Sequence, residues 1–416
     1  MGVVLSTRGS VCARRSGGEA PSEHSATPRP SRIRTEVPLK PAPACRKAVA
    51  ALHLGSEARY RRLVGVGGIG TGLFFALEGN HTLGRNESRP ARQLDVRDYC
   101  KLHIIAHYVA VLTGADPSGA PFHVLPVGRV GDDDVGRRLW REMQGAGMDV
   151  RFVERVPGEL TPVSVCFQYP DGSGGNITVR AAGALAPTPE DIDQVEPYLE
   201  AERGRAIVLA APEVPLEARG HLLRLGAQHG AFCVASFTTA EIRDALRLGL
   251  FTPVDLLAVN EEEAAALAGR ELDPSRPEAF LKSCAALLRP DARFVVTAGR
   301  HGAYAYECGT WEHCPAAQVP VVSTAGAGDA LLAGVLVGLA AGLRLVMNRA
   351  RRTTLADQPL ESALDLGTLL AAYSVTSPHT IHPEVSASRL GAFAEEIGLQ
   401  LSDRLSRLFA GRSTTA

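Results

Sequence analysis

The residues best suited to catalysis lie in segment 323–329, which reads Ser-Thr-Ala-Gly-Ala-Gly-Asp and directly precedes a long apolar stretch. We expect the backbone amides of Gly326, Ala327 and Gly328 to point from the N-terminus of a helix, where the helix dipole attracts phosphate. Asp329 would then stand beside the bound anion. An anion hole next to a carboxylate base is suited to the transfer of a phosphoryl group to a hydroxyl. The alternative is that the glycines form only a turn and that Asp329 only caps the helix.

A polar pair and a second small-residue turn each follow a predicted strand. Asn260 and Glu263 come after the apolar stretch Leu-Leu-Ala-Val, and their spacing of three residues places them on one helix face. Their oxygens can hold water around Mg²⁺, which usually keeps several waters. Thr297, Gly299 and Gly302 follow Arg-Phe-Val-Val and can wrap a nucleotide. The plainer alternatives are an acidic first helical turn for the pair and a simple strand connection for the glycines.

The elements that must position these residues alternate between strands and helices. Short apolar stretches typical of buried strands occur at 62–70, 121–131, 206–212, 231–237, 256–260 and 293–299. Several segments between them show helical periodicity, including one that Asp133 or Asp134 can cap. This alternation is typical of an α/β fold with a mostly parallel sheet covered on both faces. Segment 161–183 alternates apolar and polar residues around a glycine-rich turn, which predicts a β-hairpin that could serve as a lid.

The chain divides by composition into a leader, a folded domain and a short end. Residues 1–58 are rich in Pro, Ser and Arg and lack hydrophobic periodicity, so we predict a disordered tail there. Residues 59–395 carry the alternating elements and form the predicted domain. We expect residues 396–416 to be a C-terminal tail.

Charge and cysteine content exclude several classes of partner. The formal net charge is -1, so the chain has no overall electrostatic attraction for nucleic acid or an anionic membrane. The longest apolar stretch, 330–343, is shorter than the roughly 20 residues that a membrane span requires. The eight cysteines are scattered and form no Cys-x-x-Cys motif, which favours a reducing, cytoplasmic location. We therefore expect a small-molecule acceptor as the partner.

Four segments in this order resemble the ribokinase-like (PfkB) family of carbohydrate and nucleoside kinases. Their sequences are Gly-Arg-Val-Gly-Asp-Asp-Asp-Val-Gly at 128–136, Asn-Glu-Glu-Glu at 260–263, Thr-Ala-Gly-Arg-His-Gly at 297–302 and Ser-Thr-Ala-Gly-Ala-Gly-Asp at 323–329. They are similar to the family's GxVGxDxxG, NxxE, TxGxxG and DTxGAGD motifs, and the resemblance spans most of 62–395. It implies a Rossmann-type three-layer α/β sandwich with a small β-lid, ATP as the phosphoryl donor and a requirement for Mg²⁺.

The resemblance also implies a role for each matching position. Asp329 would be the catalytic base, and the amides of 326–328 would form the anion hole. Asn260 and Glu263 would serve Mg²⁺ and phosphate, with the metal held through water. The turn at 297–302 would lie in the nucleotide region. The family's lids often pair, which implies a possible homodimer through the lid, expected here at about 72–103 and 163–182.

The chain departs from the family where the family binds its substrate. The acidic residue that usually follows the first strand is missing, because no acid occurs between that strand and Glu78. Segment 102–107 takes the place of the family's GGxxxN motif. It puts His107 at the position of the substrate-binding Asn and His103 at that of a glycine, so both become candidate substrate-binding residues. Ser323 replaces the motif's leading Asp, which weakens the case for a monovalent-cation site.

The inserted segment after the first strands is long and basic. Within it, Arg85, Asn86 and Arg89 could clamp an anionic group of the acceptor, since guanidinium forks suit phosphate. A solvated loop is the alternative for these three residues.

Two other functions compete with a kinase that phosphorylates a hydroxyl of a sugar-like or nucleoside-like acceptor. The altered substrate segments suit a non-catalytic nucleotide sensor on a kinase fold, although the residues expected to perform the chemistry are present. Residues 65–70 read Gly-Val-Gly-Gly-Ile-Gly, a GxGxxG pattern that suits a dinucleotide-binding oxidoreductase. A dinucleotide site also requires an acidic residue at the end of a second strand, about 20 residues further on. The sequence has no acid at such a position, which counts against the oxidoreductase.

Overall fold

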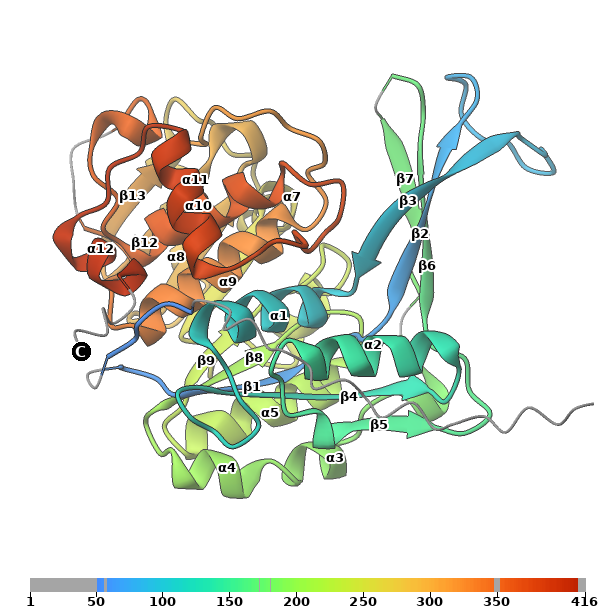
Figure 1. The fold of residues 1–416 in the computed structure, drawn as a ribbon, viewed down its shortest axis with the longest axis horizontal. Helices are drawn as coiled ribbons and strands as arrows, with labels where there is room; N and C mark the ends of the chain where they lie inside the picture. Colours follow the sequence, from blue (N-terminus) through green and yellow to red (C-terminus); the bar gives the residue numbers. More distant parts are fainter. Residues whose placement is uncertain (1–50, 56–57, 172, 180, 348–351, 411–416) are drawn as a thin grey trace, which may run out of the picture. The chain divides into compact units, whose positions relative to one another are not determined.

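The computed structural model describes residues 51–55, 58–171, 173–179, 181–347 and 352–410. Within them, one sheet holds nine strands in the order β13-β12-β11-β10-β9-β8-β1-β4-β5 (Figure 1). In that order the strands are Thr310–Cys314, Ala303–Glu307, Arg293–Thr297, Leu256–Asn260, Phe232–Ala235, Ala206–Ala210, Arg62–Val66, His123–Gly131 and Val153–Val156. Neighbouring strands from β5 to β11 are parallel, and β12 and β13 continue the sheet as antiparallel strands. The predicted α/β fold is confirmed, and the six apolar stretches predicted as buried strands each contribute a strand to this sheet.

Helices cover both faces of the sheet because successive strand residues point to opposite sides. In β1, Leu63 packs into the core on one face and Val64 into the core on the other. The first core contains residues of α1 (Lys101–Thr113), α2 (Asp134–Gly145), α9 (Ala327–Ala340), α10 (Ala363–Ser374), α11 (Ala387–Glu396) and α12 (Asp403–Phe409). The second contains residues of α3 (Pro189–Asp193), α4 (Glu196–Ala201), α5 (Leu216–Gln228), α6 (Ile242–Arg247), α7 (Glu261–Ala268) and α8 (Pro277–Ala285).

A separate four-stranded sheet forms the lid, in the order β3-β2-β6-β7 (Figure 1). Its strands are β2 (Thr71–Leu77), β3 (Ala91–Tyr99), β6 (Val163–Gln168) and β7 (Gly174–Ile177). The predicted hairpin at 161–183 is present as β6 and β7. The predicted lid segment 72–103 is too long by three residues, because Cys100 starts helix α1 and residues 101–103 are its first turn.

Both predicted tails are shorter than we expected. The first fifty residues lie outside the described part of the chain, but Leu52 and Leu54 are buried against the core. The Leu52 amide donates to the Leu112 carbonyl at 2.8 Å, which fixes this segment to the end of α1. At the other end, Leu405 and Leu408 of α12 are buried, so the folded body continues through the predicted tail from 396 to 410.

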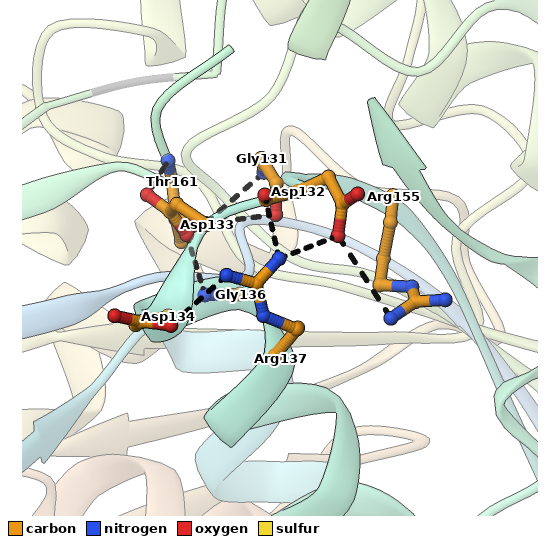
Figure 2. A network of polar contacts seen from close by, with 8 residues as sticks. All are labelled: Gly131, Asp132, Asp133, Asp134, Gly136, Arg137, Arg155 and Thr161. Carbon is orange, nitrogen blue, oxygen red and sulfur yellow. Dashed lines mark hydrogen bonds and ion pairs between the residues drawn. The ribbon is translucent and has the colours of Figure 1, made fainter. Parts of the chain in front are cut away.

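The first family motif has a structural role at the start of α2. Asp133 is the N-cap residue, and its carboxylate accepts hydrogen bonds from the Gly136 amide at 2.7 Å and from the Thr161 hydroxyl and amide at 2.7 and 2.9 Å (Figure 2). Burial opposes ionisation of this carboxyl, but the hydrogen bonds outweigh it and lower its pKa. Thr161 lies just before the lid strand β6, so the Asp133 cap joins the nine-stranded sheet to the lid.

The GxGxxG segment does not form a dinucleotide site. It follows β1 but leads directly into the lid strand β2, whereas the dinucleotide fingerprint requires a helix N-terminus at that point. A side chain at Gly68 would meet the Glu213 carboxylate, since a Cβ there would lie 2.5 Å from Oε2. The glycines therefore permit close packing, and the oxidoreductase alternative is wrong.

No described helix is long and apolar enough to cross a membrane. Among the described residues, six cysteines are present and all are free.

Candidate active site

Three adjoining cavities lie around the start of α9. The large cavity has a volume of about 620 Å³, and Thr297, Gly299 and Thr324 are among its lining residues. The central cavity, of about 190 Å³, is lined by Lys101, Ser236, Asn260, Glu263, Gly328 and Asp329 among others. The lid cavity, of about 160 Å³, is lined on one side by the lid sheet. Gly328 borders the large and central cavities and Asp329 borders the central and lid cavities, so the two residues stand at the junctions.

The turn at 323–329 places Asp329 in the first turn of α9. Gly326 is the N-cap residue with φ 77°, and a Cβ there would lie 2.9 Å from the Thr380 carbonyl, so the position requires glycine. The first amides of a helix lack acceptors within it. The Ala327 amide donates instead to the Thr324 carbonyl at 3.2 Å, so the predicted anion hole depends on Gly326 and Gly328.

Asn260 and Glu263 form a capping box at the start of α7. The Asn260 Oδ1 accepts from the Glu263 amide, and the Glu263 Oε2 accepts from the Asn260 amide, both at 2.8 Å. Burial raises the pKa of Glu263. Asn260 and Glu263 therefore do cap the helix, as the plainer alternative predicts. Both residues also line the central cavity. The described residues contain no cluster of three or more His, Cys, Asp or Glu that could hold a metal ion.

The turn after β11 borders the large cavity. Thr297, Gly299 and Gly302 all line it, and Thr297 also reaches the central cavity. Apolar side chains such as Val319, Val321, Leu331, Ala372 and Val375 form much of the remaining wall. A cavity lined by apolar side chains together with small polar residues suits a flat, apolar ring attached to a polar chain.

Lys101 is a site residue that the sequence analysis did not identify. It is the first residue of α1, and its Nζ lies 3.2 Å from Oδ1 of Asp329. The charge of Asp329 raises the pKa of Lys101 despite burial, and the charges of Glu263 and Glu213 act in the same direction. The one feature of the sequence that could have pointed to Lys101 is that lysine is rare in this arginine-rich chain.

Two acidic residues in the lid cavity were also missed. Asp98 lies at the end of lid strand β3, and burial raises its pKa to about 6, against hydrogen bonds from the Tyr99 amide and the Thr380 side chain. Glu213 follows β8, and burial raises its pKa to about 7, assisted by the charge of Asp329. Asp98 thus supplies a carboxylate on the lid, although none follows the first strand.

The predicted substrate-binding residues lie away from the three cavities. His103 and His107 are inside α1, where His103 packs against Tyr99 with ring centroids 4.5 Å apart. Burial lowers the pKa of His107 to about 4, and burial also lowers the pKa of His103.

The three residues of the inserted segment are on the loop between β2 and β3. Arg85 and Asn86 are exposed there, and Arg89 donates to Glu87 at 2.7 Å and to the His81 carbonyl at 2.6 Å. None of the three lines the lid cavity in this structure.

Comparisons with known proteins identify the family. The model described as "pfkB family carbohydrate kinase" matches residues 110–387. Over 211 residues the chain is 29% identical to the deoxyribokinase of Salmonella typhi, a match that covers 50% of this chain and 66% of the relative, just under two thirds of its length. It is 28% identical to the fructokinase of Klebsiella pneumoniae over 251 residues, covering 54% of this chain and 77% of that one.

The fold is also similar to a solved structure of Arabidopsis thaliana ribokinase complexed with ribose and ATP. The superposition has a TM-score of 0.59 at 17% identity and covers 82% of this chain and 100% of the ribokinase. Because the family model spans most of the domain that holds the three cavities, the chain belongs to the pfkB family of carbohydrate kinases.

Proposed function

We propose that this protein transfers the γ-phosphoryl group of ATP to a hydroxyl of a sugar-like or nucleoside-like acceptor. The observation that carries the proposal is the position of Asp329, which borders both the central cavity and the lid cavity. A base at that junction can reach an acceptor on one side and a phosphate on the other. The relatives named as sugar kinases, and the ribokinase bound to ribose and ATP, support this direction.

The cavities suggest how ATP is oriented. The adenine ring fits the apolar wall of the large cavity, and the phosphates extend past Gly328 into the central cavity. Asn260 and Glu263 provide oxygen ligands of the kind that Mg²⁺ prefers, and they would hold the ion through water. When bound there, magnesium neutralises charge on the phosphates.

The chemistry then needs one base and one anion hole. Asp329 accepts the proton of the acceptor hydroxyl as its oxygen attacks the γ-phosphorus in line. The new O–P bond forms while the bond from the γ-phosphorus to the ADP oxygen breaks, and ADP leaves with its electron pair. The amides of Gly326 and Gly328 donate to the charge that develops on the transferring group.

The lid cavity favours an uncharged acceptor. Its walls contain the carboxylates of Asp98 and Glu213 and the polar groups of Asn176 and Thr178. Among the described residues that line it, none is Lys or Arg. Carboxylates and amides accept hydrogen bonds from hydroxyls, whereas an anionic group would be repelled there.

The outer face of the lid fits a second copy of the chain. Phe74, Cys166 and Asn176 are paired across β2, β6 and β7, and all three line the lid cavity. Because side chains alternate between faces, the neighbouring row of Leu73, Val165 and Ile177 points away from it. Leu73 is 38% exposed and Ile177 61% exposed, so we propose that this apolar row pairs in a homodimer.

The function is tested by ADP release from Mg-ATP across a panel of sugars, sugar phosphates, nucleosides and polyols. We expect one uncharged acceptor to stimulate release by the wild-type protein. Stimulation by sugar phosphates alone would contradict the acceptor assignment. ATP binding without stimulation by any acceptor would favour the sensor alternative, and absence of ATP binding would contradict the nucleotide site.

A further inference from the structure

Lys101 supplies a positive charge where phosphoryl transfer would take place. Among the described residues that line the central and lid cavities, it is the one Lys or Arg. Its side chain is 33% exposed, its Nζ lies 3.2 Å from Asp329 Oδ1, and both residues line the central cavity. Asp329, Glu263 and Glu213 are the charged groups that face it, and together they keep it protonated.

The local structure opposes a lysine at this position. Lys101 is the first residue of α1, and a positive charge at a helix N-terminus is unfavourable because the helix dipole is positive there. Glu213 fixes the backbone of Lys101, because its Oε2 accepts a hydrogen bond from the Lys101 amide at 3.2 Å. Glu213 itself adopts φ 76°, which is uncommon for a residue other than glycine. Unfavourable local features of this kind persist where the surrounding structure enforces them, and they concentrate at functional sites.

An incoming triphosphate would meet mostly negative charge without this lysine. Asp329 and Glu263 both line the central cavity, and the Glu213 carboxylate accepts the Lys101 amide. Magnesium offsets part of the charge on ATP, but negative charge stays spread over the three equatorial oxygens of the terminal phosphoryl group during transfer. A flexible ammonium can leave a carboxylate and follow that group, because its stem has four carbons and its donors rotate.

We propose that Lys101 is a catalytic residue that releases Asp329 and binds an oxygen of the γ-phosphoryl group during transfer. This inference rests on the proposed kinase function. In the structure described here Lys101 pairs with the base, and entry of ATP would exchange that partner for phosphate. Asp329 would then be free to accept the proton of the acceptor hydroxyl. Besides lining the lid cavity, Glu213 positions Lys101, because its carboxylate accepts the Lys101 amide.

The test compares Lys101→Met, Lys101→Arg and the control Lys282→Met. Lys282 lies on α8, is exposed, pairs with Glu278 and lines none of the three cavities. Calorimetry would measure the affinity for Mg-ADP and for the magnesium complex of the β,γ-imido analogue of ATP. Steady-state kinetics with the acceptor found above would then separate kcat from KM.

We expect Lys101→Met to weaken binding of the ATP analogue by about tenfold or more while ADP affinity stays within about threefold. The kcat should fall about 100-fold or more, the usual loss when one donor to the transition state is removed. Lys101→Arg should retain more activity than Lys101→Met, because it keeps the charge, and Lys282→Met should match the wild type.

Two results would overturn the inference. Unchanged affinities with kcat within threefold of wild type would mean that Lys101 only neutralises its neighbouring carboxylates. Equal weakening of ADP and the analogue would mean that the substitution disturbs the site as a whole. If the wild-type protein binds neither nucleotide, the proposed kinase function fails instead, and that outcome is visible before any variant is compared.

Discussion

Individual carboxylates in the lid cavity carry the acceptor specificity proposed here. Asp98 lies on the lid and Glu213 on the nine-stranded body, so an acceptor between them would be held from two sides. Burial raises the pKa of Asp98 to about 6 and that of Glu213 to about 7. Both groups therefore change charge in a pH range where an ordinary carboxyl stays ionised.

Because acceptor binding would use the charge of Asp98, we expect it to weaken as the pH falls. Its carboxylate is ionised above pH 6 and protonated below, so kcat/KM for the acceptor should fall as pH drops through about 6. Asp98→Asn should raise the acceptor KM about tenfold at pH 8, since a hydrogen bond to a charged group is lost. It should also remove the step near pH 6 and leave one near pH 7 from Glu213.

The matched control is Asp95→Asn, which changes an exposed carboxylate on the same strand. Its KM and pH profile should equal those of the wild type. A wild-type profile that is flat from pH 5 to 8, or an unchanged KM in Asp98→Asn, would contradict the role given to Asp98.

The sequence points to candidate site residues that lie within motifs, but not to those brought in by long-range packing. Asp329 and its glycines are adjacent in the chain, so their combination was visible. Lys101 is 228 residues from Asp329 and 112 from Glu213, and no local pattern links them. His103 and His107 were chosen by position in a resemblance, whereas burial in α1 decides where they lie.

Among the elements, the cap of α2 ties the lid to the body. Asp133 accepts three hydrogen bonds, two of them from Thr161 next to the lid strand β6 (Figure 2). The neighbouring Asp134 instead pairs with Arg137 in an exposed contact. The two adjacent aspartates therefore differ in burial and partners, which makes them a natural comparison.

Asp133→Ala should lower the free energy of unfolding by about 1–3 kcal/mol, because it removes an N-cap and leaves amides without an acceptor. Denaturant titration of the variant measures this change. Asp134→Ala should stay within about 0.5 kcal/mol of the wild type, since exposed ion pairs contribute little. Equal stability of the two variants would show that the cap has no special role.

Helix α1 shows which elements the sequence could not predict. Buried strands of the main sheet were predicted because each is a short apolar stretch that ends in a turn. In α1 most residues are buried all around, as with Leu102, Ile105 and Tyr108, so it has no polar face to mark it. The predicted lid consequently ran three residues into the helix.

At the scale of the whole molecule, the apolar outer face of the lid favours association of two copies of the chain. Leu73, Val165 and Ile177 form one row across three strands on the face opposite the lid cavity. An open sheet with an apolar exposed face is stabilised when another surface covers it. Pairing of two lids would also hold the strands that line each acceptor cavity.

Ile177→Asp should convert a wild-type dimer to a monomer at micromolar concentration, because a charge would be buried in the apolar contact. Sedimentation velocity measures the mass of each species. The control Leu287→Asp changes another exposed apolar residue that lies outside the lid and should leave the dimer intact. A monomeric wild-type protein, or an unchanged mass in Ile177→Asp, would contradict lid pairing.

Asp329 is the residue on which the proposed transfer depends most, because it would activate the acceptor hydroxyl for attack on ATP. Phosphorus NMR of the products formed by wild-type protein and Asp329→Asn from Mg-ATP and the acceptor tests this role most directly. We predict a phosphomonoester and ADP in equal amounts with the wild type, and a rate at least about 1,000-fold lower with Asp329→Asn at nearly unchanged ATP affinity. Phosphomonoester formation by Asp329→Asn at close to the wild-type rate would mean that Asp329 is not the base.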